Sequence, residues 1–214
     1  MALNQGNQGQ IGKTTGANLT ASFGEYQETL VSELQPRYYE LAYRSQIYVA
    51  AVAAAAPTAY TGAAGGTPLI GVWNPPSSGK NLIMIQAGIG VVAAASAAGL
   101  TQFRLYAGVT ANVTGTLSNP LSTFNWATTG GGSVARFSSN AASTSSTALN
   151  YILTLGNYYW GASGGSSSFL SQPIVCDLGG SIIIPPGSMI GMGAVTVPTS
   201  MTNDAWLLWA ESYI

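Results

Sequence analysis

The sequence contains no histidine and only one cysteine, Cys176. Histidine is the commonest general base and the commonest metal ligand in proteins, so its absence excludes histidine-activated nucleophiles and removes the usual transition-metal ligand. A single cysteine cannot form an internal disulfide, and its apolar neighbours Ile174 and Val175 indicate a buried, unreactive thiol. We therefore expect no catalytic residue, no metal site and no cofactor.

Charge is also scarce. The chain has 6 basic and 7 acidic residues among 214, which is 6% and a net charge of −1, whereas average usage is roughly a quarter. Without a basic stripe to neutralise phosphates, direct binding of nucleic acid is not expected. A neutral surface of small residues suits burial against further copies of the chain or a larger assembly. The alternative is a monomer that is solvated by hydroxyl and amide groups.

Long hydrophobic runs are missing as well. The longest apolar stretches, 47–56 and 91–98, are shorter than the roughly 20 residues that span a bilayer. The start of the chain lacks a basic segment followed by an apolar one, so no signal peptide is visible. The expectation is a protein that is made and kept in a cytoplasm or assembles there, with no membrane partner.

The first 44 residues differ from the rest and are predicted to be a separate extension. Residues 1–21 are rich in Gly, Gln, Asn and Thr, which is typical of a flexible arm. The capping-box spacing of Ser22 and Glu25, followed by an apolar stripe, predicts a helix from about 23 to 34. Pro36 then favours the start of a second short helix and a kink between the two.

This extension carries just over half of the charged residues and several aromatic side chains. Two interpretations remain open: it packs on its own β-body, or it docks on a neighbouring subunit. The docking interpretation assigns the interface to Tyr26, Leu30, Leu34, Arg37, Tyr38, Tyr39, Tyr43 and Arg44.

Strand signals dominate the remainder. Ile182–Ile184 runs into Pro185, Pro186 and Gly187, a combination that ends one strand and turns the chain into the next. The same pattern recurs around 69–86, where Asn74 and two prolines separate two apolar runs. Residues 45–68 are expected to be a connector with at most one small strand, and residues 69–214 a single β-domain. The predicted strands are 69–73, 81–92, 102–110, 149–155, 173–178, 181–184, 189–197 and 205–213.

About eight strands with these turns indicate a mainly β protein, an antiparallel jelly-roll-like sandwich preceded by an arm and short helices. Within it, Phe103 and Leu105 alternate with Arg104 and Tyr106, which is typical of a sheet with one buried face.

Few motifs suggest chemistry. Gly12–Thr14 resembles the end of a phosphate-binding loop, but the required earlier glycine and strand are missing. Asp177, Asp204 and Glu211 are the only acids in the β-body, and we interpret the first two as turn residues and Glu211 as a surface acid at a strand end.

One aromatic group lies beside Gly/Ser loops and has two interpretations: it closes the end of the core, or it forms a stacking platform for glycans. Its members are Trp126, Tyr158, Tyr159 and Trp160.

Three segments resemble a recurrent family of tailed-bacteriophage structural proteins. They are Gly24–Glu40 (GEYQETLVSELQPRYYE), Trp73–Leu82 (WNPPSSGKNL) and Gly180–Gly187 (GSIIIPPG) together with the closing Trp209–Glu211. Residues 110–172 lie outside the resemblance.

The resemblance implies a virion component with a jelly-roll body. It points to a non-enzymatic, homotrimeric capsid decoration (cement) protein that is assembled in the host cytoplasm and binds the major capsid protein. The alternative is a head or tail fibre module that binds host surface glycans. A glycan hydrolase that uses two of the three body acids is the remaining, enzymatic hypothesis.

Overall fold

The computed structural model describes residues 38–93, 99–124, 132–139, 143–160, 172–197 and 200–214. The chain divides into two compact units, Met1–Tyr39 and Glu40–Ile214. The predicted arm and the helix expected at about 23–34 lie outside the described residues. Of the second predicted helix, the structure contains α1 (Tyr39–Tyr43), a single turn of 5 residues that ends where Ser45 takes a φ of 55°.

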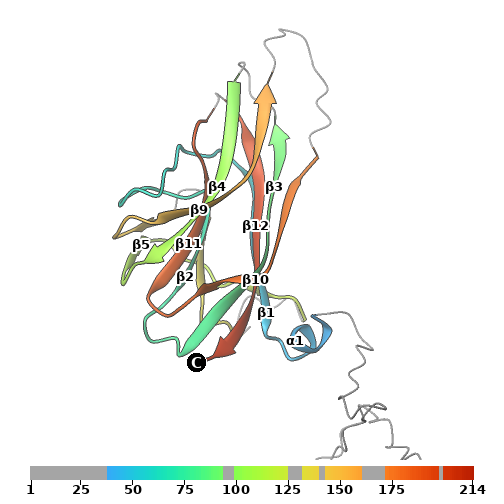
Figure 1. Cartoon of the computed structure of the whole chain (residues 1–214), viewed down its shortest axis with the longest axis vertical. Coiled ribbons are helices and arrows are strands. Elements are labelled where there is room, and N and C mark those ends of the chain that lie inside the picture. Colours follow the sequence, from blue (N-terminus) through green and yellow to red (C-terminus); the bar gives the residue numbers. More distant parts are fainter. Residues whose placement is uncertain (1–37, 94–98, 125–131, 140–142, 161–171, 198–199) are drawn as a thin grey trace, which may run out of the picture. The chain divides into compact units, whose positions relative to one another are not determined.

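The second unit contains all the described strands, which form two layers (Figure 1). They are β1 (Ile47–Ala55), β2 (Ile70–Asn74), β3 (Lys80–Ala93), β4 (Gly99–Val109), β5 (Val113–Gly115), β6 (Leu121–Ser122), β7 (Arg136–Ser139), β8 (Ser143–Ser145), β9 (Asn150–Trp160), β10 (Ile174–Ile184), β11 (Ser188–Ala194) and β12 (Thr202–Tyr213).

The sandwich consists of two five-stranded antiparallel sheets, and β5 pairs with β8 beside them. Sheet 1 has the order β10-β3-β12-β1-β6, and sheet 2 has the order β7-β2-β11-β4-β9. The principal strands pair in order from the two ends of the sequence toward its middle: β1 with β12, β2 with β11, β3 with β10, and β4 with β9. A long antiparallel hairpin rolled up in this way is a jelly roll. The predicted fold class is confirmed.

The segment 45–68 differs from the expectation of a connector. It contains β1, which lies between β12 and β6 in sheet 1 and buries Ile47, Tyr48 and Ala50. Alanine has low strand propensity, so this alanine-rich run carries little local signal, and its pairing with β12 makes it a strand. The jelly roll therefore begins at Ile47.

The predicted strands 173–178 and 181–184 are one strand, β10. Gly179 and Gly180 take positive φ angles of 55° and 85°, and the register with β3 shifts between Asp177 and Ile182. The two glycines form a bulge that bends the strand without ending it. The number of principal strands was right, although one predicted boundary was an irregularity and β1, a strand of 9 residues, was expected only as a small strand within a connector.

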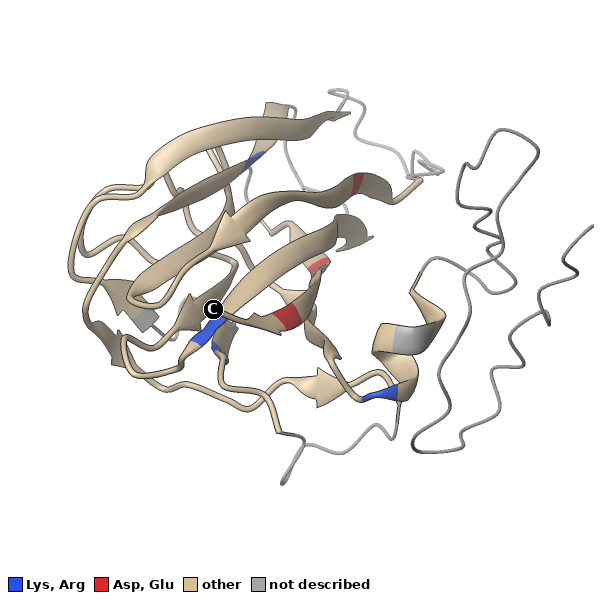
Figure 2. Ribbon diagram, turned by 60° about the horizontal axis from the view of Figure 1, so that its bottom comes forward, with Lys and Arg blue, Asp and Glu red and all other residues tan. Residues whose placement is uncertain are grey.

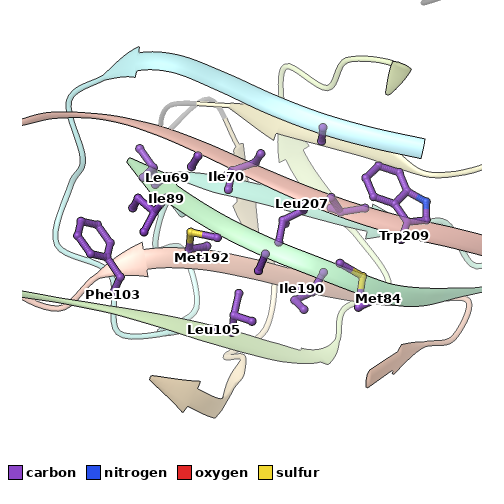
Figure 3. Close-up of a cluster of buried hydrophobic side chains, with 14 of the residues drawn as sticks. Leu69, Ile70, Met84, Ile89, Phe103, Leu105, Ile190, Met192, Leu207 and Trp209 are labelled. Carbon is purple, nitrogen blue, oxygen red and sulfur yellow. The ribbon is translucent and has the colours of Figure 1, made fainter. Parts of the chain in front are cut away.

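The core lies between the inner faces of the sheets (Figure 3). Phe103 and Leu105 point into it from β4, as their alternation with polar residues predicts. Side chains from β3 and β12 of sheet 1 and from the neighbouring β11 belong to the same core. All of the following are fully buried: Met84, Ile89, Ile190, Met192, Leu207 and Trp209.

The two Pro-Pro turns cross between the sheets. One joins β2 to β3 and the other joins β10 to β11. They lie against each other, because the Gly187 amide donates to the Asn74 carbonyl at 2.8 Å. The buried Asn74 side chain also donates to the carbonyls of Lys80 (2.8 Å) and Ile184 (2.9 Å). Two sequence motifs more than a hundred residues apart therefore form one corner of the sandwich.

Candidate functional site

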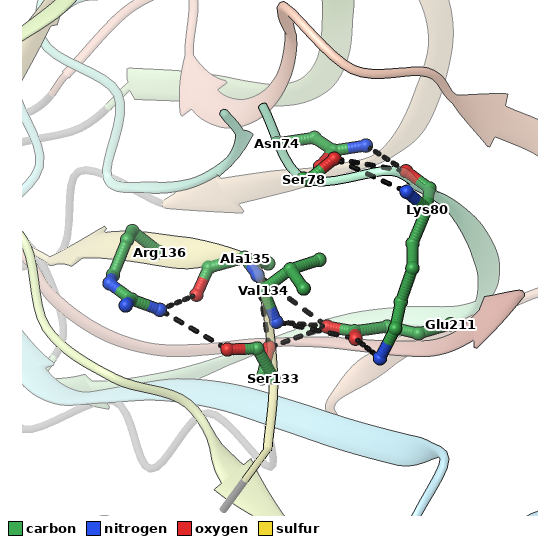
Figure 4. A network of polar contacts seen from close by, with 8 residues as sticks. All are labelled: Asn74, Ser78, Lys80, Ser133, Val134, Ala135, Arg136 and Glu211. Carbon is green, nitrogen blue, oxygen red and sulfur yellow. Dashed lines mark hydrogen bonds and ion pairs between the residues drawn. The ribbon is translucent and has the colours of Figure 1, made fainter. Parts of the chain in front are cut away.

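A buried carboxylate, Glu211 on β12, is the centre of a network of polar contacts (Figure 4). Its oxygens accept hydrogen bonds from Ser133 Oγ at 2.6 Å and from the Val134 amide at 3.1 Å. The Lys80 ammonium lies 3.1 Å away and forms an ion pair with it. Glu211 is only 3% exposed, so the interpretation as a surface acid was wrong.

This network ties the segment 133–135 to sheet 1. Arg136 adds hydrogen bonds to the carbonyls of Ser133 (3.3 Å) and Ala135 (2.8 Å). Burial, together with the nearby negative charges of Glu211 and Tyr213, raises the pKa of the Tyr48 phenol to about 12. Since every carboxylate oxygen of Glu211 has a protein partner, the arrangement fits a structural anchor.

The other two acids of the β-domain, Asp177 and Asp204, also accept hydrogen bonds from backbone amides. Asp177 accepts from the Gly179 amide at 2.9 Å, within the β10 bulge. Asp204 accepts from the Ala54 amide at 2.8 Å, where β1 is irregular. Both residues belong to strands, so their interpretation as turn residues was wrong. Each carboxylate nevertheless accepts a hydrogen bond from an amide where the strand is irregular.

Asp204 and Glu211 are not brought together as a catalytic pair. Asp204 and Glu211 lie on the same strand, β12, and seven residues of strand span roughly 23 Å. Glycoside hydrolysis needs two carboxyl groups about 5–9 Å apart. Among the residues that the structure describes, no group of three Asp, Glu, Cys or His side chains could hold a metal ion.

Of the predicted docking residues, Tyr26, Leu30, Leu34 and Arg37 lie outside the described residues. Tyr39 and Tyr43, on α1, are 47% and 48% exposed. Arg44 is exposed and Tyr38 is half-buried.

Phe124 is a neighbour that the sequence analysis missed. It is 52% exposed, and its ring meets that of Tyr43 edge-on, with centroids 5.4 Å apart. It comes from the loosely patterned middle of the chain, where no periodicity singles it out. The pair forms an exposed aromatic site at the start of the jelly roll.

The predicted aromatic platform separates into members with different environments. Tyr158 points inward, packs edge-on against Phe103 at 5.9 Å, and donates through its hydroxyl to the Gln172 carbonyl at 2.9 Å. Tyr159 is 69% exposed. Trp160 ends β9 opposite Gly99, and its side chain, like all of Trp126, is outside the described part. Tyr158 therefore supports the core interpretation for one member.

Cys176 lies on β10, opposite Ala87, and is half-buried against the core. The expectation of a fully buried thiol needs correction, because β10 is the outermost strand of sheet 1. Its side chain points inward but has no further strand beside it in the described structure.

A shallow hollow of about 450 Å³ lies beside β1, β6 and β7. It contains no charged side chain and is lined by Val49, Ala51, Leu117, Ser118, Asn119, Leu121 and Phe137. This lining offers no catalytic or metal-binding group.

Comparisons with protein-family models, with curated proteins and with solved structures found no match. In the part of the chain that the structure covers, no helix has the length and apolarity to cross a membrane.

Proposed function

We propose that this chain is a non-enzymatic structural protein of a tailed-bacteriophage virion. In this proposal it is a homotrimeric capsid decoration protein that binds and stabilises the major capsid shell. The observation that carries the proposal is the nearly uncharged surface of the sandwich (Figure 2). From Ile47 onward the only charged residues are Lys80, Arg104, Arg136, Asp177, Asp204 and Glu211. Two of these six, Lys80 and Glu211, neutralise each other with side chains 16% and 1% exposed.

A neutral surface of this kind suits permanent contact with other subunits, because few charges must be desolvated when it is covered. Exposed apolar side chains are present on β9 and β10, including Ile183 (56%), Val175 (50%) and Ile152 (38%). Both features support an assembly protein rather than a dispersed monomer.

The segments that resemble phage structural proteins support the same proposal. Trp73–Leu82 and Gly180–Gly187 form the two turns that meet at Asn74, and Glu211 is the buried anchor. The resemblance therefore rests on residues that build the jelly roll, and it favours a structural role over a chemical one.

Such a protein stabilises the capsid shell by binding to it, according to mass action. A molecule that binds only the assembled shell stabilises it by RT ln(1 + [L]/Kd). If the three copies of a trimer contact neighbouring capsid subunits, each contact raises the effective concentration for the next. The shell then resists the pressure of its packaged genome without any catalysed reaction.

The docking element in this proposal is the segment 1–44. Its described end places Tyr39 and Tyr43 on α1 with about half of each side chain exposed. Since β1 begins at Ile47, removing residues 1–44 leaves every strand of the jelly roll in place.

The experiment compares full-length protein with a variant that lacks residues 1–44. We expect the truncated protein to keep its melting temperature and oligomeric state but to lose occupancy on purified capsids. Deleting only residues 1–38 is the matched control, because it retains α1 and the Tyr43–Phe124 contact. Full occupancy of the 1–44 deletion would contradict the docking role.

The fibre-module alternative depends on an aromatic glycan platform. Tyr159 is available for it, but the Tyr158 ring and hydroxyl are engaged inside the protein. We therefore prefer the decoration role to a glycan site built from Trp126, Tyr158, Tyr159 and Trp160.

A further inference from the structure

The outer face of sheet 2 is covered over β11 and at Tyr106 of β4, and it is more exposed along β9 and at the half-buried Gln102 and Arg104 of β4. On β11, Gly193 leaves room for the Tyr60 ring, since a Cβ at this position would lie 2.5 Å from the Tyr60 Cβ. Tyr60 is 1% exposed and packs edge-on against Tyr106 at 5.2 Å. Farther along β4 the outward side chains are Gln102 and Arg104, and in the described structure no segment covers them to the same degree.

Arg104 is held in a defined orientation on this open face. Its guanidinium carbon lies 5.1 Å from the centroid of the Tyr151 ring, in a cation–π contact. Its Nε donates to Gln102 Oε1 at 2.5 Å. Two contacts on different sides of the guanidinium restrict its rotation and leave its terminal N–H groups for another partner.

The neighbours of Arg104 are polar, aromatic and uncharged. Thr154 is its cross-strand partner on β9, and Thr154 Oγ1 lies 3.1 Å from the Tyr151 hydroxyl. Asn157, which is exposed, lies opposite Gln102. We call these five residues, Gln102, Arg104, Tyr151, Thr154 and Asn157, the β4–β9 patch.

Arg104 is the only charged residue of β4 and β9. Among the described residues no carboxylate forms an ion pair with it. Within the described residues its positive charge therefore has no compensating carboxylate, although the guanidinium is already oriented. A planar guanidinium in this state matches a carboxylate, which accepts two parallel N–H donors.

We propose that the β4–β9 patch binds a carboxylate-bearing saccharide. Arg104 would bind the carboxylate, and Gln102, Thr154 and Asn157 would bond to the hydroxyl groups of the sugar. The part of the Tyr151 ring that Arg104 and Tyr106 leave exposed would pack against the apolar face of the sugar ring. A nucleic acid would need several cations to neutralise successive phosphates, and this face has one. The site differs from the aromatic platform considered above, and it does not depend on the decoration role.

The test uses full-length protein and an oligogalacturonate, with its fully methyl-esterified form as the matched ligand. The esters keep the sugar rings and remove the charge. Sialyllactose and lactose form a second acidic and neutral pair, and polyglutamate is the acidic peptide probe. Calorimetry should show saturable binding of at least one acidic saccharide, with at least about tenfold weaker binding of its neutral counterpart, the size expected when a charge-assisted bidentate contact is lost.

Variants then locate the site. Arg104→Gln should weaken binding about tenfold or more, Arg104→Lys should restore only part of it, and Tyr151→Leu should weaken it several-fold. Arg136→Gln is the control, because it removes the same charge from β7, at the opposite edge of sheet 2. Melting curves confirm that each variant is folded, and Arg136→Gln should bind like the unmodified protein.

Three results would overturn the proposal. One is the absence of binding to both acidic saccharides at millimolar concentration. Another is binding that Arg104→Gln leaves unchanged. The third is equal affinity for polyglutamate, which would assign the patch to acidic peptides. Occupancy on capsids is measured separately, so failure here leaves the decoration proposal standing.

Discussion

The two edges of the sandwich are built differently. At one edge lie β6 and β7, strands of 2 and 4 residues. Ser118 and Phe137 bridge there, with hydrogen bonds of 2.8 Å and 3.0 Å, and Glu211 fixes the segment that leads into β7. At the other edge lie β9 and β10, each 11 residues long. We call these the closed edge and the open edge.

Long exposed edge strands are normally protected by charge, proline or a bulge, because their free N–H and C=O groups pair readily with other chains. The open edge has one charge, Asp177, and one pair of bulge glycines, Gly179 and Gly180. No described strand pairs with its outer side. The comparison indicates that short strands and side-chain contacts protect the closed edge. The backbone groups of the open edge remain available for pairing with another chain.

The largest expected effect comes from breaking the closed edge at Glu211. Glu211→Ala leaves Lys80 partly buried without its ion-pair partner and leaves the Val134 amide unbonded. We expect a loss of about 3–5 kcal/mol in the free energy of unfolding, as for other buried pairs that lose one member. Denaturant unfolding measures it.

The matched change on the open edge is Asp177→Asn. Asp177 is exposed and accepts one backbone hydrogen bond, so the expected loss is below about 1 kcal/mol. Equal losses for the two variants would show that the closed edge is not specially anchored.

A lysine on the open edge should disrupt assembly without unfolding the protein. Ile152 on β9 is 38% exposed, and a charge there would have to be desolvated if another copy covered the strand. We expect Ile152→Lys to convert the proposed homotrimer into monomers in sedimentation experiments, with an unchanged melting temperature.

Val109→Lys is the control for this change, because Val109 is 73% exposed at the end of β4, away from the outer edge of β9. It should leave the oligomeric state intact. If Ile152→Lys sediments like the unmodified protein, the open edge is not the assembly surface.

The rate of thiol labelling in the folded protein should also differ between the two edges. Cys176 is half-buried on β10, so local opening of the open edge should let it react in the native protein, faster than global unfolding allows. The comparison variant carries Cys176→Ser and Ser138→Cys. Ser138 on β7 is 1% exposed, and its hydroxyl has no hydrogen-bond partner among the described residues, so the replacement is conservative.

We expect the cysteine at position 138 to react only at the rate of global unfolding, measured with the same reagent and quantified by mass spectrometry. Equal rates at the two positions would mean that both edges open together.

The smallest effect is confined to alkaline pH. The pKa of Tyr48, on β1, is about 12 in the folded protein, whereas an unfolded tyrosine titrates near about 10. The folded state keeps the proton that the unfolded state loses. The contribution to stability is therefore complete below a pH of about 10 and is lost as the pH rises toward 12.

Burial also raises the pKa of Tyr60 to about 12, so two residues contribute to this loss. Tyr48→Phe should reduce the decline in unfolding free energy between pH 10 and 12. If the unfolding free energy of Tyr48→Phe declines as much as that of the unmodified protein, the loss of stability comes from groups other than Tyr48.

Several features were readable from the sequence because they depend on neighbouring residues. Proline fixes φ and glycine permits positive φ, so Pro185, Pro186 and Gly187 predict a turn wherever they occur. The alternation of Phe103 and Leu105 with polar residues predicts which face of β4 is buried, because side chains alternate along any strand. Together with the eight-strand count, these signals were enough for the fold class.

The tertiary structure decided the features that depend on distant residues. Ala50 belongs to a strand because β12 lies beside it, and Glu211 is buried because Lys80 and Ser133 reach it from 131 and 78 residues away. Likewise, Arg104 faces an open, tyrosine-lined patch because β9 pairs with β4. Local composition encodes turns and periodicity, but the burial of a charge and the exposure of an edge depend on which segments meet after the chain has folded.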